Sequence, residues 1–180
     1  MTKDRKVILY IAASLDGYIA KPNDDLSFLS LIQSTGEDYG YDDLKKSIDT
    51  VIMGRKTFDW VMKQIGGVPH PDTDTYVITR TKRPDIGKTK FYTENLSELV
   101  RNLKEEKGKN IYCDGGAEIV TELLKEQLID EVIISIIPVL LGEGTRLFKD
   151  GRPEQELTLV SVKQFKSGLA QLYYKRADKI

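Results

Sequence analysis

The sequence predicts an α/β fold of three layers, α/β/α, in which a mostly parallel central sheet ends in an antiparallel C-terminal hairpin. Three observations support this prediction. Apolar runs of strand length are nearly all continuous rather than alternating, which is typical of strands covered on both faces. Segments with helical spacing of apolar residues separate these runs through most of the chain. After Leu141 come two β-rich runs, Leu157–Phe165 and Leu169–Lys175, joined by Lys166-Ser167-Gly168 as a hairpin turn.

The expected strands and helices follow one another along the chain. Before the hairpin, the runs expected to form buried strands are Val7–Ala13, Thr50–Met53, Thr75–Thr79, Asn110–Cys113 and Val132–Leu141. Helical spacing of apolar residues covers residues 41–48, 58–65, 96–103 and 119–124. Asn95 and Glu98 have capping-box spacing at the start of the third helix, and Gly108 is expected to end that helix with a left-handed cap.

Length and composition indicate one domain whose recognition of any partner must be local. The 180 residues, of which 40% are hydrophobic, suffice for one well-buried domain over residues 1–180 and are too few for two ordinary ones. The 27 basic and 28 acidic residues are spread along the chain, so no footprint for nucleic acid or a membrane is visible. The N-terminus lacks a signal-peptide pattern, Cys113 is the single cysteine and no metal-ligand spacing appears, so we expect a cytoplasmic protein without a metal site.

The first candidate phosphate site is Asp114-Gly115-Gly116-Ala117, where a buried strand ends in paired glycines and a helix begins. Without Cβ atoms the backbone can approach a ligand closely, and the free N–H groups of the helix start point toward an anion. The alternative interpretation is a tight strand-to-helix turn that binds nothing.

The second candidate phosphate site is Thr50–Thr57, a buried strand that runs into a glycine and then a helix with two cations and a hydroxyl in its first turn. Cations at this end of a helix oppose the helix dipole unless an anion lies between them. A solvated surface turn is the alternative. Tyr76–Thr81 adds a third strand end with hydroxyls and a guanidinium, which suits a phosphate monoester.

These three segments, TVIMGRKTFD, YVITRT and CDGGAEIVTELL, resemble the dihydrofolate reductase superfamily in their order and approximate separation. Within that superfamily, Ala13–Ala20 and Leu128–Phe148 are similar to the reductase domain of riboflavin biosynthesis and its small stand-alone relatives. The resemblance runs from Ile8 to about Phe148. It implies a dihydrofolate-reductase-like fold and NADPH as the cofactor.

The resemblance also implies two groups of cofactor contacts. Residues expected to face the dinucleotide are Ala13, Gly54, Arg55, Lys56, Thr57, Gly115, Gly116, Ala117, Glu118 and Ile119. Residues expected to face the adenosine 2′-phosphate are Thr79, Arg80 and Thr81. Glu118 stands where folate reductases commonly carry a basic residue. Because Arg55, Lys56, Arg80 and Lys82 supply positive charge nearby, NADPH is still expected rather than NADH.

On the substrate side, Asp25 has the local setting of the acid that binds the pterin ring in folate reductases, and Ser135 falls where a hydroxyl supports that carboxylate. A semi-buried Asp25 would bind an amino-pyrimidine edge or assist proton delivery, so both are candidate catalytic residues. The alternative is that Asp25 or its neighbour Asp24 caps the next helix. Residues expected at the substrate are Ser14, Asp16 and Phe28, although Asp-Gly is also a common turn dipeptide.

Two features depart from folate reductases: a short loop, which weakens a direct transfer of catalytic roles, and a missing arginine, which disfavours folate as the substrate. The loop between Asp16 and Asp25 is short and lacks their Pro-Trp pair. The stretch Gly67–Thr75, a polar loop that contains His70, has no arginine to clamp a glutamate tail.

The leading hypothesis is hydride transfer from NADPH to a C=N or C=O bond of a small heterocycle or sugar-like substrate, of the ribosylaminouracil phosphate reductase type. The alternatives are a nucleotide-binding module of the same fold without turnover and a true dihydrofolate reductase. The resemblance also suggests a homodimer, with its contact near Val132–Leu141 or in the C-terminal hairpin.

Overall fold

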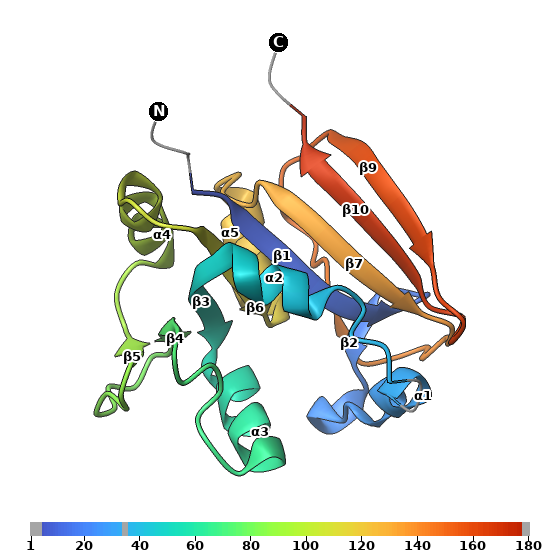
Figure 1. Cartoon of the computed structure of the whole chain (residues 1–180), viewed down its shortest axis with the longest axis horizontal. Coiled ribbons are helices and arrows are strands. Elements are labelled where there is room, and N and C mark those ends of the chain that lie inside the picture. The colour runs from blue at the N-terminus through green and yellow to red at the C-terminus, as the bar shows by residue number, and fades with distance from the viewer. Residues whose placement is uncertain (1–4, 34–35, 178–180) are drawn as a thin grey trace.

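The computed structural model describes residues 5–33 and 36–177 and is built around one eight-stranded sheet (Figure 1). The strands follow the order β5-β4-β3-β6-β1-β7-β10-β9. Their bounds are β1 (Val7–Ser14), β3 (Ile48–Gly54), β4 (Asp74–Ile78), β5 (Thr89–Tyr92), β6 (Asn110–Gly115), β7 (Glu131–Ile137), β9 (Leu157–Gln164) and β10 (Ala170–Arg176). A separate antiparallel ribbon pairs β2 (Tyr18–Ala20) with β8 (Thr145–Arg146).

The sheet is mostly parallel, as predicted. Each neighbouring pair from β5 to β7 runs parallel, whereas β10 is antiparallel to both β7 and β9. β9 and β10 form the predicted C-terminal hairpin. In its turn the Gly168 N–H donates to the Phe165 carbonyl at 3.0 Å, and Gly168 has a φ of 85° that favours glycine.

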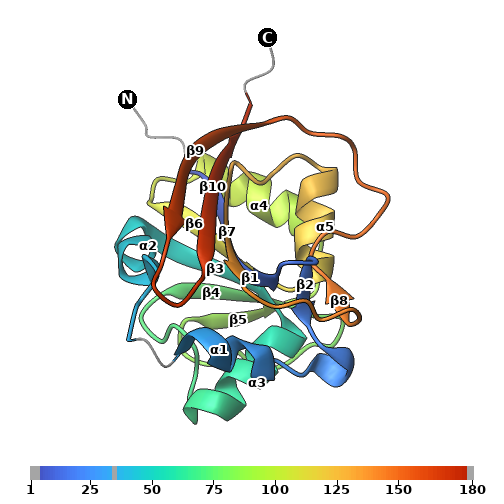
Figure 2. The ribbon, with the colours of Figure 1, turned by 90° about the vertical axis from the view of Figure 1, so that its right-hand side faces the viewer.

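Helices cover both faces of the sheet and complete the three layers (Figure 2). α4 (Leu96–Glu105) and α5 (Ala117–Lys125) pack on one face, and α2 (Tyr41–Ser47) and α3 (Arg55–Ile65) pack on the other. The short elements η1 (Pro22–Asp24), η2 (Ser27–Leu29) and α1 (Ser30–Gln33) follow the β2 strand. No helix in the described ranges is long and apolar enough to cross a membrane.

Alternation along the central strands explains their continuous apolar runs. In β1, Val7 and Leu9 join the core under α4 and α5, while Ile8 between them joins the core under α2 and α3. In β6, Cys113 and Tyr112 divide in the same way. Because both faces are covered by helices, these strands carry nearly continuous apolar runs, and most of their positions are buried.

The end of β7 and the position of β5 differ from the prediction. β7 ends at Ile137 rather than at Leu141, because Pro138 has no N–H to continue the ladder. The edge strand β5 was not expected, since its four residues are too few to give a clear pattern and only two of them are aromatic.

One helix cap is confirmed and another is wrong. The Asn95 side chain accepts a hydrogen bond from the Glu98 N–H at 2.9 Å, as predicted. Gly108 does not cap α4, because the helix ends at Glu105 and Gly108 lacks a left-handed φ. Its small size serves a close approach instead, since a Cβ there would lie 2.5 Å from Asp49 Oδ2.

A buried arginine ties the amino ends of the strands together. Arg5 is only 4% exposed and forms an ion pair with Asp49. It also donates to Thr50 Oγ1 at 2.7 Å and to the carbonyls of Lys109 and Leu103 at 2.7 and 3.0 Å. Because the guanidinium bonds to groups from β3, α4 and the loop before β6, it fixes this end of the sheet.

Candidate functional site

The carboxyl ends of the parallel strands meet at the opposite edge of the sheet from Arg5. β3 ends at Gly54 and β6 ends at Gly115, and each leads almost directly into a helix. β4 ends beside them at Ile78, and β1 ends at Ser14. Ligands of open α/β sheets bind in the crevice at this edge.

The two candidate phosphate turns are brought into contact. A Cβ placed on Gly54 would lie 3.6 Å from the Gly116 nitrogen and 3.6 Å from Ile119 Cγ1. A Cβ placed on Gly116 would lie 3.7 Å from Thr57 Oγ1. Gly115 has a φ of 92°, a conformation that favours glycine. The glycines therefore leave the two helix starts side by side with open backbone between them.

The backbone of the two turns at Gly54 and Gly116 forms a cradle, and this cradle fits the pyrophosphate of a dinucleotide. Gly54 and Gly116 are the N-cap residues of α3 and α5, and neither helix start receives a hydrogen bond from a cap side chain. Two sets of helix N–H groups are thus directed toward one place, where a diphosphate carries two adjacent anionic groups. Ala117 and Ile119 are buried beneath the turn, where their side chains support the start of α5.

Two cations and one carboxylate lie at the helix starts beside the cradle. Arg55 is half-buried and bonds to Asp59 on the next turn of α3 at 2.8 Å. Lys56 is exposed, and its Nζ lies 3.5 Å from Asp24. Glu118 is also exposed at the start of α5, where its carboxylate would oppose an anion.

The segment after β4 forms a compact turn near these cations. Thr79 is buried, and its hydroxyl accepts a hydrogen bond from the Thr81 N–H at 3.1 Å. Arg80 between them is exposed. The structure therefore orients this segment through Thr79 and leaves the Arg80 guanidinium at the surface.

The end of β1 is held by an aspartate. Ala13 and Ser14 are buried, and the Ser14 hydroxyl donates to Asp16 at 2.6 Å. Asp16 also accepts from the backbone N–H groups of Leu141 and Gly142 at 3.0 and 2.7 Å. These bonds, led by that from Ser14, lower the pKa of Asp16 to about 2. Asp16 thus connects β1 to the segment after β7, while Ser14 turns inward.

Asp25 and Ser135 are not brought together. Asp25 is exposed rather than semi-buried, and it accepts hydrogen bonds from the N–H and hydroxyl of Ser27 at 2.7 and 3.1 Å. The alternative that Asp24 or Asp25 caps the next helix is wrong as well, because Leu26 is the N-cap of η2 and no side chain caps that helix. Ser135 is buried in β7 and accepts from Gln171 at 3.1 Å. Phe28 is 3% exposed and belongs to the core near the hairpin.

Comparisons with known proteins agree with this geometry. A profile of the RibD C-terminal domain matches residues 5–171. The chain belongs to the RibD C-terminal domain family. The Bacillus subtilis (strain 168) protein YwjB is 42% identical to it over 177 residues, which is 97% of this chain and 99% of YwjB.

Two solved structures place this RibD C-terminal domain among dihydrofolate-reductase-like folds, as the sequence predicts. A crystal structure from Shewanella sp. PV-4, which carries the name of a riboflavin biosynthesis protein, matches with a TM-score of 0.86 and 29% identity, covering 96% of this chain and 99% of its own. Dihydrofolate reductase from Enterococcus faecalis shares the fold, with a TM-score of 0.66 and 17% identity over 99% and 100% of the two chains.

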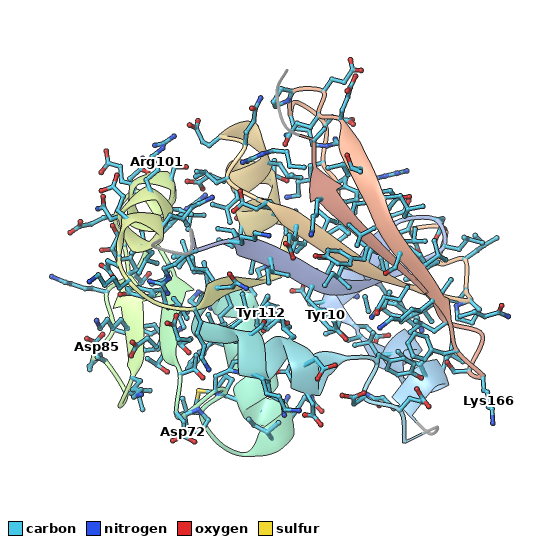
Figure 3. All side chains as sticks on the ribbon, turned by 45° about the horizontal axis from the view of Figure 1, so that its top comes forward. Tyr10, Asp72, Asp85, Arg101, Tyr112 and Lys166 are labelled. Atoms are coloured by element: carbon cyan, nitrogen blue, oxygen red, sulfur yellow. The ribbon has the colours of Figure 1, made fainter. Side chains whose placement is uncertain are left out.

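One polar cluster of this RibD C-terminal domain was missed in the sequence. Asp114, the residue before the glycine pair, is half-buried and accepts a hydrogen bond from the Tyr112 hydroxyl at 2.6 Å. Tyr10 and Tyr112 lie side by side, with ring centroids 6.4 Å apart (Figure 3). His70 meets the Tyr112 ring edge-on at 6.0 Å. His70 lies in the loop between α3 and β4, as predicted, and its contact with Tyr112 shows that this loop folds back over the α2 and α3 face.

The cluster shifts the pKa values of its members. Limited contact with water raises the pKa of Asp114, and the hydrogen bond from Tyr112 and the nearby His70 oppose that rise. Burial lowers the pKa of His70 against the charge of Asp114. A carboxyl with a raised pKa keeps its proton to higher pH, so Asp114 is suited to act as an acid.

Proposed function

We propose that this RibD C-terminal domain is a reductase that transfers hydride from NADPH to a C=N or C=O bond of a small heterocyclic or sugar-like substrate. The observation that carries the proposal is the contact between the turns at Gly54 and Gly116, which sets two uncapped helix starts against each other. The family match supports a reductase of the ribosylaminouracil phosphate type.

In this proposal the protein binds and orients. NADPH supplies the hydride when bound. The helix starts at Gly54 and Gly116 would hold its pyrophosphate, and Thr79–Thr81 with the nearby cations would hold the 2′-phosphate. Ala13 and Ser14 lie at the end of β1, where they would line the wall next to the reacting atoms.

Asp114 is the proposed proton source. It directly precedes Gly115 in β6, so it lies beside the cradle, and its raised pKa favours the protonated form. Tyr112 fixes the orientation of this carboxyl through the 2.6 Å hydrogen bond. The exposed Asp25 has neither of these advantages.

Calorimetric titration of the purified protein with NADPH and with NADH at low salt tests the proposal. Saturable binding with a preference for NADPH is expected, followed by NADPH oxidation with at least one acceptor from a panel of carbonyl, imine and dihydrofolate substrates. If neither nucleotide binds, the proposal is wrong. Binding without oxidation across the panel would favour the nucleotide-binding module, and oxidation with dihydrofolate alone would favour a folate reductase.

We also propose that the protein acts as a cytoplasmic homodimer. β7 is an unsuitable contact, because it lies inside the sheet between β1 and β10. The β9 edge strand of the hairpin is suitable, since Leu157, Leu159, Val160 and Val162 are 44–57% exposed along it. The buried free thiol of Cys113 is consistent with a reducing compartment.

A further inference from the structure

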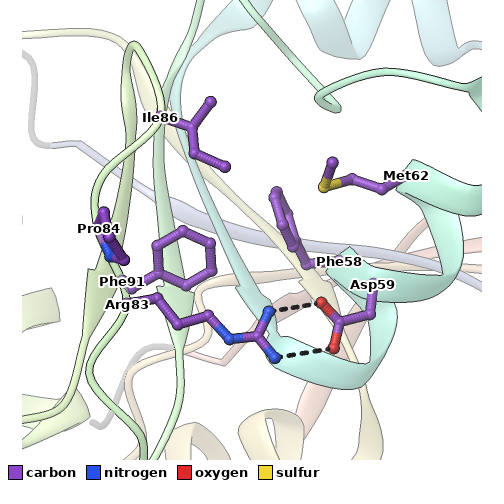
Figure 4. Close-up of a pocket in the computed structure, with 7 residues that line it drawn as sticks. All are labelled: Phe58, Asp59, Met62, Arg83, Pro84, Ile86 and Phe91. Atoms are coloured by element: carbon purple, nitrogen blue, oxygen red, sulfur yellow. Dashed lines mark hydrogen bonds and ion pairs between the residues drawn. The ribbon is translucent and has the colours of Figure 1, made fainter.

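Asp59 lies between two arginines from different parts of the chain. Its Oδ2 accepts from Arg55 Nη1 at 2.8 Å. Its Oδ1 accepts from Arg83 Nη1 at 2.8 Å, and Figure 4 shows this second pair. A longer contact of 3.4 Å joins Arg83 Nη2 to Oδ2. The hydrogen bond from Arg83 and then that from Arg55 lower the pKa of Asp59, so its carboxyl group is ionised at neutral pH. Arg55, Asp59 and Arg83 thus form an ion-pair bridge.

The bridge connects the start of α3, which the proposed function assigns to the pyrophosphate, with the loop after β4, which it assigns to the adenosine 2′-phosphate. Arg55 is the first residue of α3 and directly follows Gly54. Arg83 lies two residues beyond Thr81, in the loop between β4 and β5. Asp59 therefore holds a guanidinium from the helix start and a guanidinium from the loop at a common point.

Packing fixes the orientation of Arg83 from the other side. Its guanidinium lies 5.5 Å from the centre of the Phe91 ring, and Phe91 meets Phe58 edge-on at 5.4 Å. These side chains, with Met62, line a cavity of about 530 Å³ behind the bridge. An arginine held by a carboxylate and an aromatic face loses little further freedom when it binds an anion.

The bridge leaves binding capacity for an anion. The bonds to Asp59 use one of the five N–H donors of Arg55 and two of those of Arg83. The Arg55 and Arg83 side chains are 40% and 37% exposed, so a ligand can reach them. One carboxylate between two guanidinium groups leaves a net positive charge, which suits a phosphate dianion.

We infer that Asp59 is a positioning residue that sets the preference for NADPH over NADH, because it presents Arg55 and Arg83 together to the 2′-phosphate. The inference rests on the proposed function and adds Arg83 to the residues that read the cofactor. NADH lacks the 2′-phosphate, so its affinity does not depend on the bridge.

Asp59→Asn and Glu118→Gln form the decisive pair of variants, tested by calorimetric titration with NADPH and NADH. Each removes one negative charge near the proposed cofactor site, so a pure charge effect would strengthen NADPH binding in both. Positioning predicts opposite results: Asp59→Asn weakens NADPH binding about tenfold and changes NADH binding less than about twofold, whereas Glu118→Gln binds both nucleotides at least as tightly as the wild type. Unchanged NADH affinity shows that Asp59→Asn is folded.

A second pair of variants distinguishes a specific role of Arg83 from a general effect of positive charge. Arg83→Met is expected to weaken NADPH binding about tenfold and to leave NADH binding within about twofold, whereas Lys82→Met, which removes a neighbouring exposed cation, costs less than about threefold. Asp59→Asn with wild-type or tighter NADPH affinity, or equal losses in Arg83→Met and Lys82→Met, would overturn the inference. If wild-type protein binds neither nucleotide, the proposed function itself fails, which is a distinguishable result.

Discussion

The environments of Asp25 and Asp114 decide which carboxyl can deliver a proton. Asp25 is exposed, and hydrogen bonds from Ser27 lower its pKa, so it holds its proton poorly near neutral pH. Asp114 is half-buried beside Tyr112, and its pKa is raised. Since general acids work best with pKa values near the working pH, Asp114 has the more suitable environment.

Asp114→Asn is therefore expected to lower kcat roughly 100-fold or more, because Asn keeps the hydrogen bond from Tyr112 but carries no acidic proton. NADPH affinity should stay within about twofold. Asp25→Asn provides the matched comparison and is expected to retain most of its activity. Both are measured by NADPH oxidation with the best acceptor of the panel. A large loss in Asp25→Asn together with an active Asp114→Asn would restore the role that the sequence suggests for Asp25.

Asp16 makes the stability of the fold depend on acid pH. Its folded pKa of about 2 lies below the ordinary aspartate value of 3.8, so its bonds stabilise the folded state above pH 3.8, and this contribution is lost as the pH falls toward 2. Asp16→Asn is thus expected to be less stable than wild type near neutral pH, with a difference that shrinks in acid. Denaturant unfolding at several pH values measures this difference, and Asp72→Asn serves as an exposed control. A difference that is constant with pH would contradict the prediction.

At the scale of elements, the binding capacity of the glycine turns depends on the space that the absence of a Cβ leaves beside the backbone. Gly54 has an ordinary φ of −75°, and a Cβ there would make only contacts of 3.6 Å or more. Gly54→Ala should therefore fold, with a stability change of about 1 kcal/mol or less. The new methyl would cover the Gly116 nitrogen, so the affinities for NADPH and NADH should both fall about tenfold or more.

Gly67→Ala is the matched control for this substitution, because a Cβ at Gly67 meets nothing within 4 Å. Thermal unfolding and titration with both nucleotides compare the two variants. Wild-type affinity in Gly54→Ala would show that the cradle between the helix starts does not hold the pyrophosphate.

The sequence predicts those elements whose pattern is local. The runs at Val7–Ala13 and Asn110–Cys113 predict β1 and β6 well, because strands covered on both faces are apolar at every position. The glycine turns are equally local. The position of His70 over Tyr112 is not, because it depends on how a proline-flanked loop folds back across the sheet.

The candidate site, too, is predictable from the sequence only where its pattern is local. The turns at Gly54 and Gly116 are recognisable separately, but their contact follows from the pairing of β3 with β6. Asp114 offers one signal, a charged residue at the end of an apolar strand. The bridge at Asp59 offers only an i, i+4 pair with Arg55, and nothing local indicates its second partner, Arg83.

For the whole molecule, the exposed apolar side chains of β9 predict how two copies associate. Leu159 and Val162 are 52% and 57% exposed on this edge strand. The double variant Leu159→Lys and Val162→Lys should convert a dimer into a monomer, because lysine charges resist burial at an edge. Sedimentation velocity measures the mass. Ile65→Lys is the control, since Ile65 is 59% exposed at the end of α3, outside both segments predicted for the contact, and should leave the dimer intact. A monomeric wild type would refute the proposed dimer.

The network around Arg5 has a consequence for how this protein can diversify. It fixes the amino ends of the strands with bonds that involve no residue of the ligand crevice. Loops at the carboxyl ends, such as residues 79–88 after β4, can therefore be exchanged for those of relatives while the anchored end preserves the scaffold. Selection for a new substrate can change the carboxyl ends of the strands without destabilising their amino ends. This chain is therefore a suitable starting point for directed evolution.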